Sequence, residues 1–223
     1  MMKRWVGICM LSILLLIPAP IIGADGSKAE GSPVNPSLLN SLRQGGYILY
    51  VRHGEAGVGV DQPHLDFGNC KAQSNLTEEG KRQAKLYGEV LRSLRIPVQT
   101  PVQASPFCRT RESAELAFGK GNVEVDPFWV QIYKLSGQIT PAEQDSTLAA
   151  LTSVLEKVQA PGTNKVIVTH SFPKGVGLGE IANLGTVVVR PRGSGKGYEV
   201  VDRISLNELL SLHESTLTLE TAR

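Results

Sequence analysis

Three short segments of this sequence carry side chains that could bind an anion and react with it. Together they supply two arginines and two histidines: Arg52, His53, Arg109 and His170. An arginine guanidinium presents a planar fork of N–H groups that matches the oxygens of an anion. A histidine imidazole can act as a nucleophile or move protons near neutral pH. The combination predicts oxyanion binding coupled to nucleophilic or acid–base chemistry.

Each of these segments follows a strand candidate, and two of the three candidates are apolar runs that suit a buried strand. The candidates are 47–51 (YILYV), 98–104 (VQTPVQA) and 165–169 (KVIVT). Short apolar runs of this kind are typical of strands covered on both faces. In open α/β sheets, ligands bind beyond the carboxyl ends of the strands. The four side chains therefore fall where such a sheet would place a site.

Helical patterns alternate with these runs. Thr77 can cap a helix that ends before Pro97, the segment 108–118 is a second helix, and Thr140 opens a third with a capping box and a proline. We expect the third helix to continue to Pro161. Its predicted apolar face consists of Leu148, Leu151, Leu155 and Val158.

Segments 186–190 and 198–204 flank the turn-rich stretch PRGSGKG and predict a hairpin at the edge of the sheet. The alternation of strands and helices predicts an α/β protein, a three-layer α/β/α sandwich with a mostly parallel central sheet.

Four stretches of the sequence resemble the histidine phosphatase superfamily, also called phosphoglycerate mutase-like. They are 52–55 (RHGE), 76–84 (LTEEGKRQA), 105–114 (SPFCRTRESA) and 166–170 (VIVTH), in the order and at the intervals of that family. The resemblance covers most of the chain from about Tyr47 to Ile204. The surroundings of Cys70 and Cys108 are most similar to exported bacterial members, a group that includes lipopolysaccharide core heptose phosphate phosphatases.

The resemblance implies hydrolysis of a phosphomonoester through a phosphohistidine intermediate on His53, without a metal or another cofactor. Arg52, Arg109 and His170 would then bind the phosphate and stabilise the charge that develops during transfer. Nearby arginines disfavour the imidazolium, which keeps His53 neutral and nucleophilic. Two alternatives remain open: a phosphomutase or isomerase of the same superfamily, and a non-catalytic protein that binds a phosphorylated ligand.

The general acid departs from the patterns of the family. The acid-phosphatase branch would place an aspartate directly after the second histidine, where this chain has Ser171. The mutase-like branch would place a glutamate in the segment 126–137, in which Asp126 is the only acidic residue. We select Glu180, ten residues beyond His170, as the general acid. Three other carboxylates remain alternatives: Glu55, Asp61 and Asp66.

Residues 1–24 are expected to be a signal peptide. Lys3 and Arg4 precede an uncharged apolar stretch, and small residues lead up to Asp25. A retained membrane anchor is the alternative, although Pro18 and Pro20 interrupt the helix that a span needs. We expect cleavage after Ala24, export to the periplasm or the medium, and no stable membrane association afterwards. Residues 25–35 are predicted to be a flexible leader and residues 36–223 a single histidine phosphatase-like domain.

Cys70 and Cys108 are the two cysteines beyond the predicted signal, and in an oxidising compartment they could form a disulfide. Two buried free thiols are the alternative. No CxxC or HExxH pattern is present, so no metal site is predicted.

The charge balance gives no reason to expect a polyanionic partner. The chain has 23 basic and 21 acidic residues, and without Lys3 and Arg4 the two totals are 21 each. A neutral chain is not typical of proteins that bind nucleic acid. The expected partner is a small phosphorylated or phospho-glycan substrate, and the oligomeric state is left open.

Overall fold

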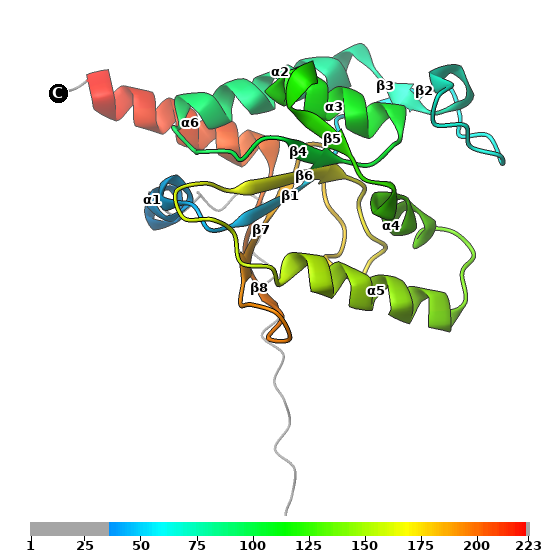
Figure 1. Ribbon diagram of the computed structural model, residues 1–223. Coiled ribbons are helices and arrows are strands. Elements are labelled where there is room, and N and C mark those ends of the chain that lie inside the picture. Colours follow the sequence, from blue (N-terminus) through cyan, green and yellow to red (C-terminus); the bar gives the residue numbers. More distant parts are fainter. Residues whose placement is uncertain (1–35, 222–223) are drawn as a thin grey trace, which may run out of the picture.

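The computed structural model describes residues 36–221, so the predicted signal peptide and leader lie outside the described residues. One six-stranded sheet forms the middle of the molecule (Figure 1). Its strands, in spatial order, are β5 (Val123–Val125), β4 (Val102–Ala104), β6 (Lys165–Thr169), β1 (Ile48–Arg52), β7 (Thr186–Pro191) and β8 (Tyr198–Ile204). The first four strands run parallel, and β7 and β8 pair antiparallel at one edge.

Helices cover both faces of this sheet (Figure 1). One layer contains α1 (Pro36–Gln44), α2 (Glu78–Ser93), α3 (Cys108–Phe118) and α6 (Leu206–Thr221), and the other contains α4 (Val130–Lys134) and α5 (Pro141–Leu155). Two separate apolar clusters, one on each face, contain the alternate side chains of the central strands: Leu49 and Val51 belong to one cluster and Ile48 and Tyr50 to the other. The predicted three-layer sandwich with a mostly parallel sheet is confirmed.

A small second sheet lies beside the main one and consists of β2 (Ala56–Val58) and β3 (Asn75–Leu76), which pair antiparallel. The segment between them, residues 59–74, is called the rim loop below. It contains a short 3-10 helix, Cys70–Ala72, and two others lie at Lys120–Asn122 and Pro127–Trp129. The sequence patterns had not indicated β2, β3, β5, α1 or α4.

The predicted helix starts are confirmed in detail. Thr77 is the N-cap of α2, and its hydroxyl accepts a hydrogen bond from the backbone N–H of Gly80 at 3.0 Å. Thr140 and Glu143 form the predicted capping box at the start of α5. The predicted helix 108–118 and the strand 165–169 have the bounds of α3 and β6, and 186–190 and 198–204 form the predicted hairpin.

Two boundaries were predicted wrongly. Only the last three residues of 98–104 form a strand, and Val98 makes an isolated bridge with Asn164. Pro97 and Pro101 explain this, because proline has no N–H to donate to a ladder. Helix α5 ends at Leu155, so Val158 lies beyond it and is 70% exposed instead of forming part of the apolar face.

Candidate active site

The carboxyl ends of three neighbouring strands meet at one edge of the sheet. In the sheet, β6 lies between β4 and β1, and Arg52 is in register with Thr169. The backbone N–H of His53 donates to the carbonyl of Thr169 at 3.0 Å, and the N–H of Ser105 donates to Val168 at 3.1 Å. These bonds extend the ladder just past the strands and hold the reactive segments together.

His53 is buried and its ring is held in one orientation. Its exposed fraction is 7%, and its Nδ1 lies 2.7 Å from the carbonyl oxygen of Gly54. A carbonyl oxygen only accepts, so Nδ1 carries the proton and Nε2 keeps its lone pair. Burial lowers the pKa of His53 to about 3; the Gly54 carbonyl opposes this shift and the charges of Arg109 and Arg52 add to it. His53 is therefore a neutral imidazole with a free Nε2.

His170 lies beside His53, with 5.5 Å between the ring centroids, and is 4% exposed. Its Nε2 is 3.1 Å from the hydroxyl oxygen of Ser105, and the ring of Phe107 packs edge-on against it at 4.7 Å. Burial, followed by the proximity of His53 and of the arginines, lowers the pKa of His170 well below its ordinary value. The site thus contains two neutral imidazoles.

Arg52 and Arg109 bring the positive charge. Nη1 of Arg52 donates to the carbonyl of Ile181 at 2.8 Å, while its Nε is buried without a hydrogen-bond partner among the described residues. Arg109 is 5% exposed, and its guanidinium carbon lies 4.5 Å from the centre of the Phe107 ring. Burial and the charge of Arg109 lower the pKa of Arg52, as expected for two guanidinium groups that share one site. A bound anion would offset both the burial of the Arg52 guanidinium and its repulsion from Arg109.

Asp61, on the rim loop, makes an ion pair with Arg109, with 3.0 Å between Nη1 and Oδ1. The same nitrogen of Arg109 donates to the carbonyl of Ser74 at 3.0 Å. The hydroxyl of Tyr133, on α4, donates to the other oxygen of Asp61 at 3.1 Å. The structure therefore adds Asp61 and Tyr133 to the four side chains that the sequence had brought together.

Glu180, which we selected as the general acid, has an exposed side chain in the loop before β7. The carbonyl of the next residue, Ile181, accepts from Arg52, so this loop borders the site. Asp66 is also exposed and caps the backbone N–H of Gly68. One oxygen of Glu55 accepts from Thr77. Among the four carboxylates considered, Asp61 is the one whose side chain forms an ion pair with Arg109 in the described part of the chain.

Cys70 and Cys108 are bonded in the structure, with their Cα atoms 5.7 Å apart. The bond links the rim loop to the first residue of α3, next to Arg109. The buried side chain of Gln73 supports the same junction, because its Oε1 accepts from the backbone N–H of Cys108 at 2.9 Å. Arg111 lies against both sulfurs, at 3.6 and 3.7 Å from its Nη2.

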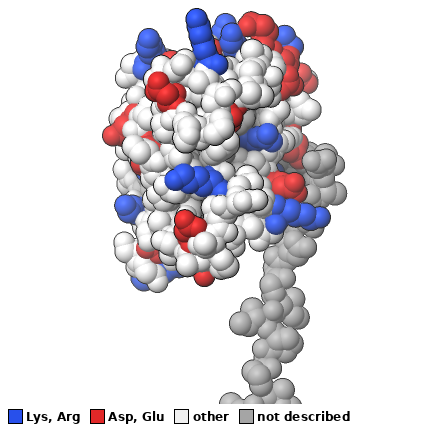
Figure 2. All heavy atoms as spheres, turned by 90° about the vertical axis from the view of Figure 1, so that its right-hand side faces the viewer, with Lys and Arg blue, Asp and Glu red and all other residues white. Residues whose placement is uncertain are grey.

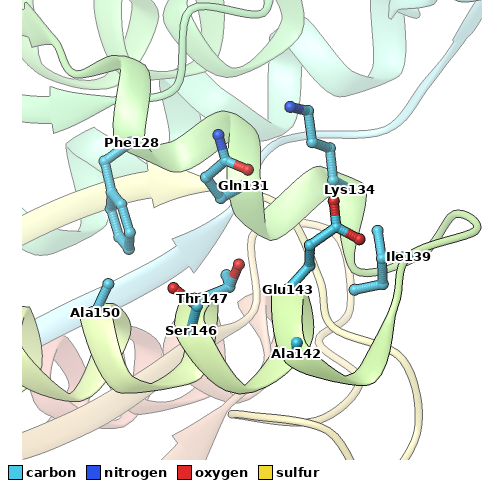
Figure 3. Close-up of a pocket in the computed structure, with 9 residues that line it drawn as sticks. All are labelled: Phe128, Gln131, Lys134, Ile139, Ala142, Glu143, Ser146, Thr147 and Ala150. Carbon is cyan, nitrogen blue, oxygen red and sulfur yellow. The ribbon is translucent and has the colours of Figure 1, made fainter.

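A separate groove of about 470 Å³ lies between α4 and α5 (Figure 3). Lys134 and Gln131 line it from α4, and Glu143 and Thr147 line it from α5. The helix that carries Tyr133 into the site thus also borders this groove. The carboxylate of Glu143 accepts hydrogen bonds from the backbone N–H and the hydroxyl of Thr140 in the capping box of α5.

Within residues 36–221, no three His, Cys, Asp or Glu side chains come together in a way that could hold a metal ion. In the same part of the chain, no helix has the length and apolar character needed to cross a membrane.

Comparison with known proteins agrees with this geometry. The sequence model of the histidine phosphatase superfamily (branch 1) matches residues 48–129, which include Arg52, His53 and Arg109. The serine/threonine-protein phosphatase Pgam5, mitochondrial, of Drosophila grimshawi is 34% identical over 87 residues, which are 37% of this chain and 27% of that protein. The match thus spans about a quarter of the length of that relative.

Two solved structures are similar to this chain, and the likeness of fold rests on the first of them. A phosphoserine phosphatase from Entamoeba histolytica, in complex with 3-phosphoglyceric acid, superposes with a TM-score of 0.50 at 15% identity and covers 73% of this chain and 98% of its own. An alpha-ribazole phosphatase from Shigella flexneri has a TM-score of 0.47 at 14% identity and covers 72% and 96%. Over residues 48–129 this chain is therefore similar to the histidine phosphatase superfamily, and its fold is similar to that of the Entamoeba structure.

Proposed function

We propose that this protein is an exported phosphatase that hydrolyses a phosphomonoester through a phosphohistidine intermediate on His53, without a metal. The observation that carries the proposal is the state of His53. Its Nδ1 is bonded to the carbonyl of Gly54, and its pKa is lowered to about 3. Nε2 is therefore an unprotonated nucleophile at neutral pH, in a site that contains two guanidinium groups.

In the first step, Nε2 of His53 attacks phosphorus, an N–P bond forms, and the P–O bond to the leaving group breaks. The leaving oxygen takes up one proton from Glu180, which we retain in this proposal as the general acid, and departs as an alcohol. Arg52 and Arg109 offer N–H groups to the non-bridging oxygens, and the unpartnered Nε of Arg52 is a donor that an oxyanion would satisfy. His170 adds a further contact. Positioning and charge stabilisation account for most of the catalysis of phosphoryl transfer.

In the second step, water attacks phosphorus, an O–P bond forms and the N–P bond breaks. The attacking water gives one proton to the Glu180 carboxylate, and inorganic phosphate and neutral His53 result. The low exposure of the site strengthens the attraction between the arginines and the phosphoryl group, because buried charges interact more strongly than exposed ones. His53, Arg109 and His170 are each at most 7% exposed. The arginines supply the positive charge that a metal supplies in other phosphatases.

The proposed substrate is a small phosphorylated metabolite or a phospho-glycan. The Entamoeba phosphatase of the same fold was solved with 3-phosphoglyceric acid, which is consistent with a small anionic ligand. On the face shown in Figure 2, basic and acidic side chains are interspersed and form no large patch of one sign. This surface does not favour a nucleic acid, which would need a basic stripe.

The test of the mechanism combines turnover with trapping. The purified chain should release inorganic phosphate from p-nitrophenyl phosphate and from members of a phosphorylated metabolite panel, with EDTA present. A ³²P-labelled substrate should leave an acid-labile, base-stable label on the wild-type protein and none on His53→Ala. Calorimetry with inorganic phosphate should show that His53→Ala still binds the anion, since both arginines remain.

Near wild-type turnover by His53→Ala would refute the mechanism. Phosphate binding with no turnover of any substrate would favour a non-catalytic binding protein, and recovery of the phosphoryl group on another position of the substrate would favour a mutase. The proposal also includes cleavage after Ala24. Expression of the full chain and mass measurement of the exported product should give a protein that begins at Asp25, whereas a membrane-bound product with its full mass would indicate an anchor.

A further inference from the structure

Asp61 is held by three separate donors. Its Oδ1 accepts from Nη1 of Arg109 at 3.0 Å and from the backbone N–H of Ser74 at 2.9 Å, and its Oδ2 accepts from the hydroxyl of Tyr133 at 3.1 Å. The donors come from α3, from the far end of the rim loop and from α4, so three elements converge on one carboxylate. A carboxylate bonded on both oxygens in this way has a fixed orientation.

The pair that Asp61 makes with Arg109 is shielded from water. The exposed fractions of the two side chains are 16% and 6%. Partial burial alone would raise the pKa of Asp61, but the hydrogen bonds from Arg109 and Ser74 and the charge of Arg109 lower it. Asp61 is therefore a carboxylate, not a carboxylic acid, in the resting protein.

Asp61 also restricts the orientation of the Arg109 guanidinium and its attraction for a bound phosphate. Nη1 of Arg109 is shared between Asp61 and the carbonyl of Ser74. These two contacts, with the stacking of the guanidinium on Phe107 at 4.5 Å, fix its plane. A bound phosphate would bring a second negative charge close to the carboxylate. The attraction to Arg109 would then be accompanied by repulsion from Asp61.

From this arrangement we propose that Asp61 is the positioning residue of Arg109: it fixes the guanidinium for the transition state and weakens the binding of phosphate in the ground state. This inference rests on the proposed phosphatase function. Since tightly bound inorganic phosphate would dissociate slowly, a carboxylate that opposes its binding favours release of the product. Asp61 acts through Arg109 and does not transfer a proton.

The substitution Asp61→Asn separates the two effects. Asparagine keeps an oxygen for Arg109 and Ser74 but loses the negative charge, and its amide nitrogen cannot accept from Tyr133. We expect kcat to fall on the order of 100-fold, because a misplaced charge donor costs about that much. Inorganic phosphate should bind several-fold more tightly, as measured by calorimetry and by product inhibition. Asp66→Asn, in the same loop, is the matched control, because the Asp66 side chain is exposed and accepts from the backbone N–H of Gly68.

A second substrate distinguishes positioning from proton donation. p-Nitrophenolate leaves without a proton, whereas an alkoxide requires one. A positioning residue should affect p-nitrophenyl phosphate and an alkyl phosphate equally. A loss confined to the alkyl phosphate would identify Asp61 as the general acid and overturn the proposal. Weaker phosphate binding in parallel with the lower kcat would indicate a merely structural role and would also overturn it.

Tyr133→Phe provides an independent variant with a smaller structural change, because it removes only one bond to Asp61. It should change kcat and phosphate affinity in the same directions as Asp61→Asn, but by less. Changes of kcat or phosphate affinity in the opposite direction would contradict the role of the Tyr133–Asp61–Arg109 contacts. The calorimetric comparison needs no turnover, so it tests Asp61 even if the wild-type protein forms no phosphohistidine. Failure of the phosphohistidine mechanism and failure of this inference are therefore distinguishable.

Discussion

Acidification should destabilise this protein, because its two buried histidines, His53 and His170, have lowered pKa values in the folded state. The pKa of His53 is lowered to about 3 in the folded state, while a histidine in the unfolded chain has a pKa of about 6.5. Between these two pH values the unfolded chain binds a proton that the folded protein does not. The free energy of unfolding therefore falls as the pH falls below 6.5 and levels off below pH 3.

For a change from pH 7 to pH 5, these two pKa values give a loss of about 2 kcal/mol from His53 alone. The lowered pKa of His170 acts in the same direction. Asp61 behaves differently, because its pKa is lowered from 3.8 and its contribution is lost only at more acidic pH. The interval from pH 7 to pH 5 thus isolates the histidines.

The assay is urea unfolding at both pH values, followed by the fluorescence of the buried Trp129. The wild-type protein is compared with His53→Asn, which has no titratable group but keeps an N–H for the carbonyl of Gly54. We expect the loss of stability between pH 7 and pH 5 to be smaller by about 2 kcal/mol in the variant. His64→Asn, at an exposed position of the rim loop, is the matched control. Equal losses in the wild type and in His53→Asn would refute the reasoning.

Three further predictions follow from named contacts. Arg109→Ala should lower kcat by about 10²–10³ and affect substrate affinity less, because its donors matter most in the transition state; a change in KM alone would contradict this. Replacing Cys70 and Cys108 by serine should lower the free energy of unfolding by about 4 kcal/mol, given their separation of 38 residues, and an unchanged urea midpoint would contradict the expectation. Gly88→Ala should cost about 1–3 kcal/mol, because a Cβ there would meet the backbone of α3. Gly121→Ala, with nothing within 4 Å, is its control in the same unfolding experiment.

The positions of the reactive residues at the strand ends could be predicted, because each depends only on the few residues that precede it in the sequence. A buried parallel strand appears in the sequence as a short apolar run, and the residue that follows it must lie at the edge of the sheet. His53 and His170 were placed in this way. Their proximity required only that β1 and β6 be neighbours, which the pairing of Arg52 with Thr169 shows.

The partners of Arg109 could not be predicted, because they come from segments without a periodic signal. Asp61 lies in a loop, 48 residues away from Arg109. Tyr133 lies on α4, a helix of five residues, which is too short to produce an apolar stripe. Glu180 was selected because it follows His170 in the sequence, and its side chain is exposed in the structure. Choosing among four carboxylates required knowing how the rim loop folds back onto α3.

Because Cys70 and Cys108 form a disulfide, the redox conditions of expression and storage should affect the specific activity that is measured. A protein made in a reducing cytoplasm, or stored with a thiol, would have the same sequence and sheet, but its rim loop would be attached only through non-covalent contacts, such as the hydrogen bond from Cys108 to Gln73 and the Asp61–Arg109 ion pair. The loop carries Asp61, so the orientation of the Arg109 guanidinium group would differ between the oxidised and reduced proteins. Batches could then differ in specific activity while appearing identical on a denaturing, reducing gel. A count of free thiols belongs beside every rate measured on this protein.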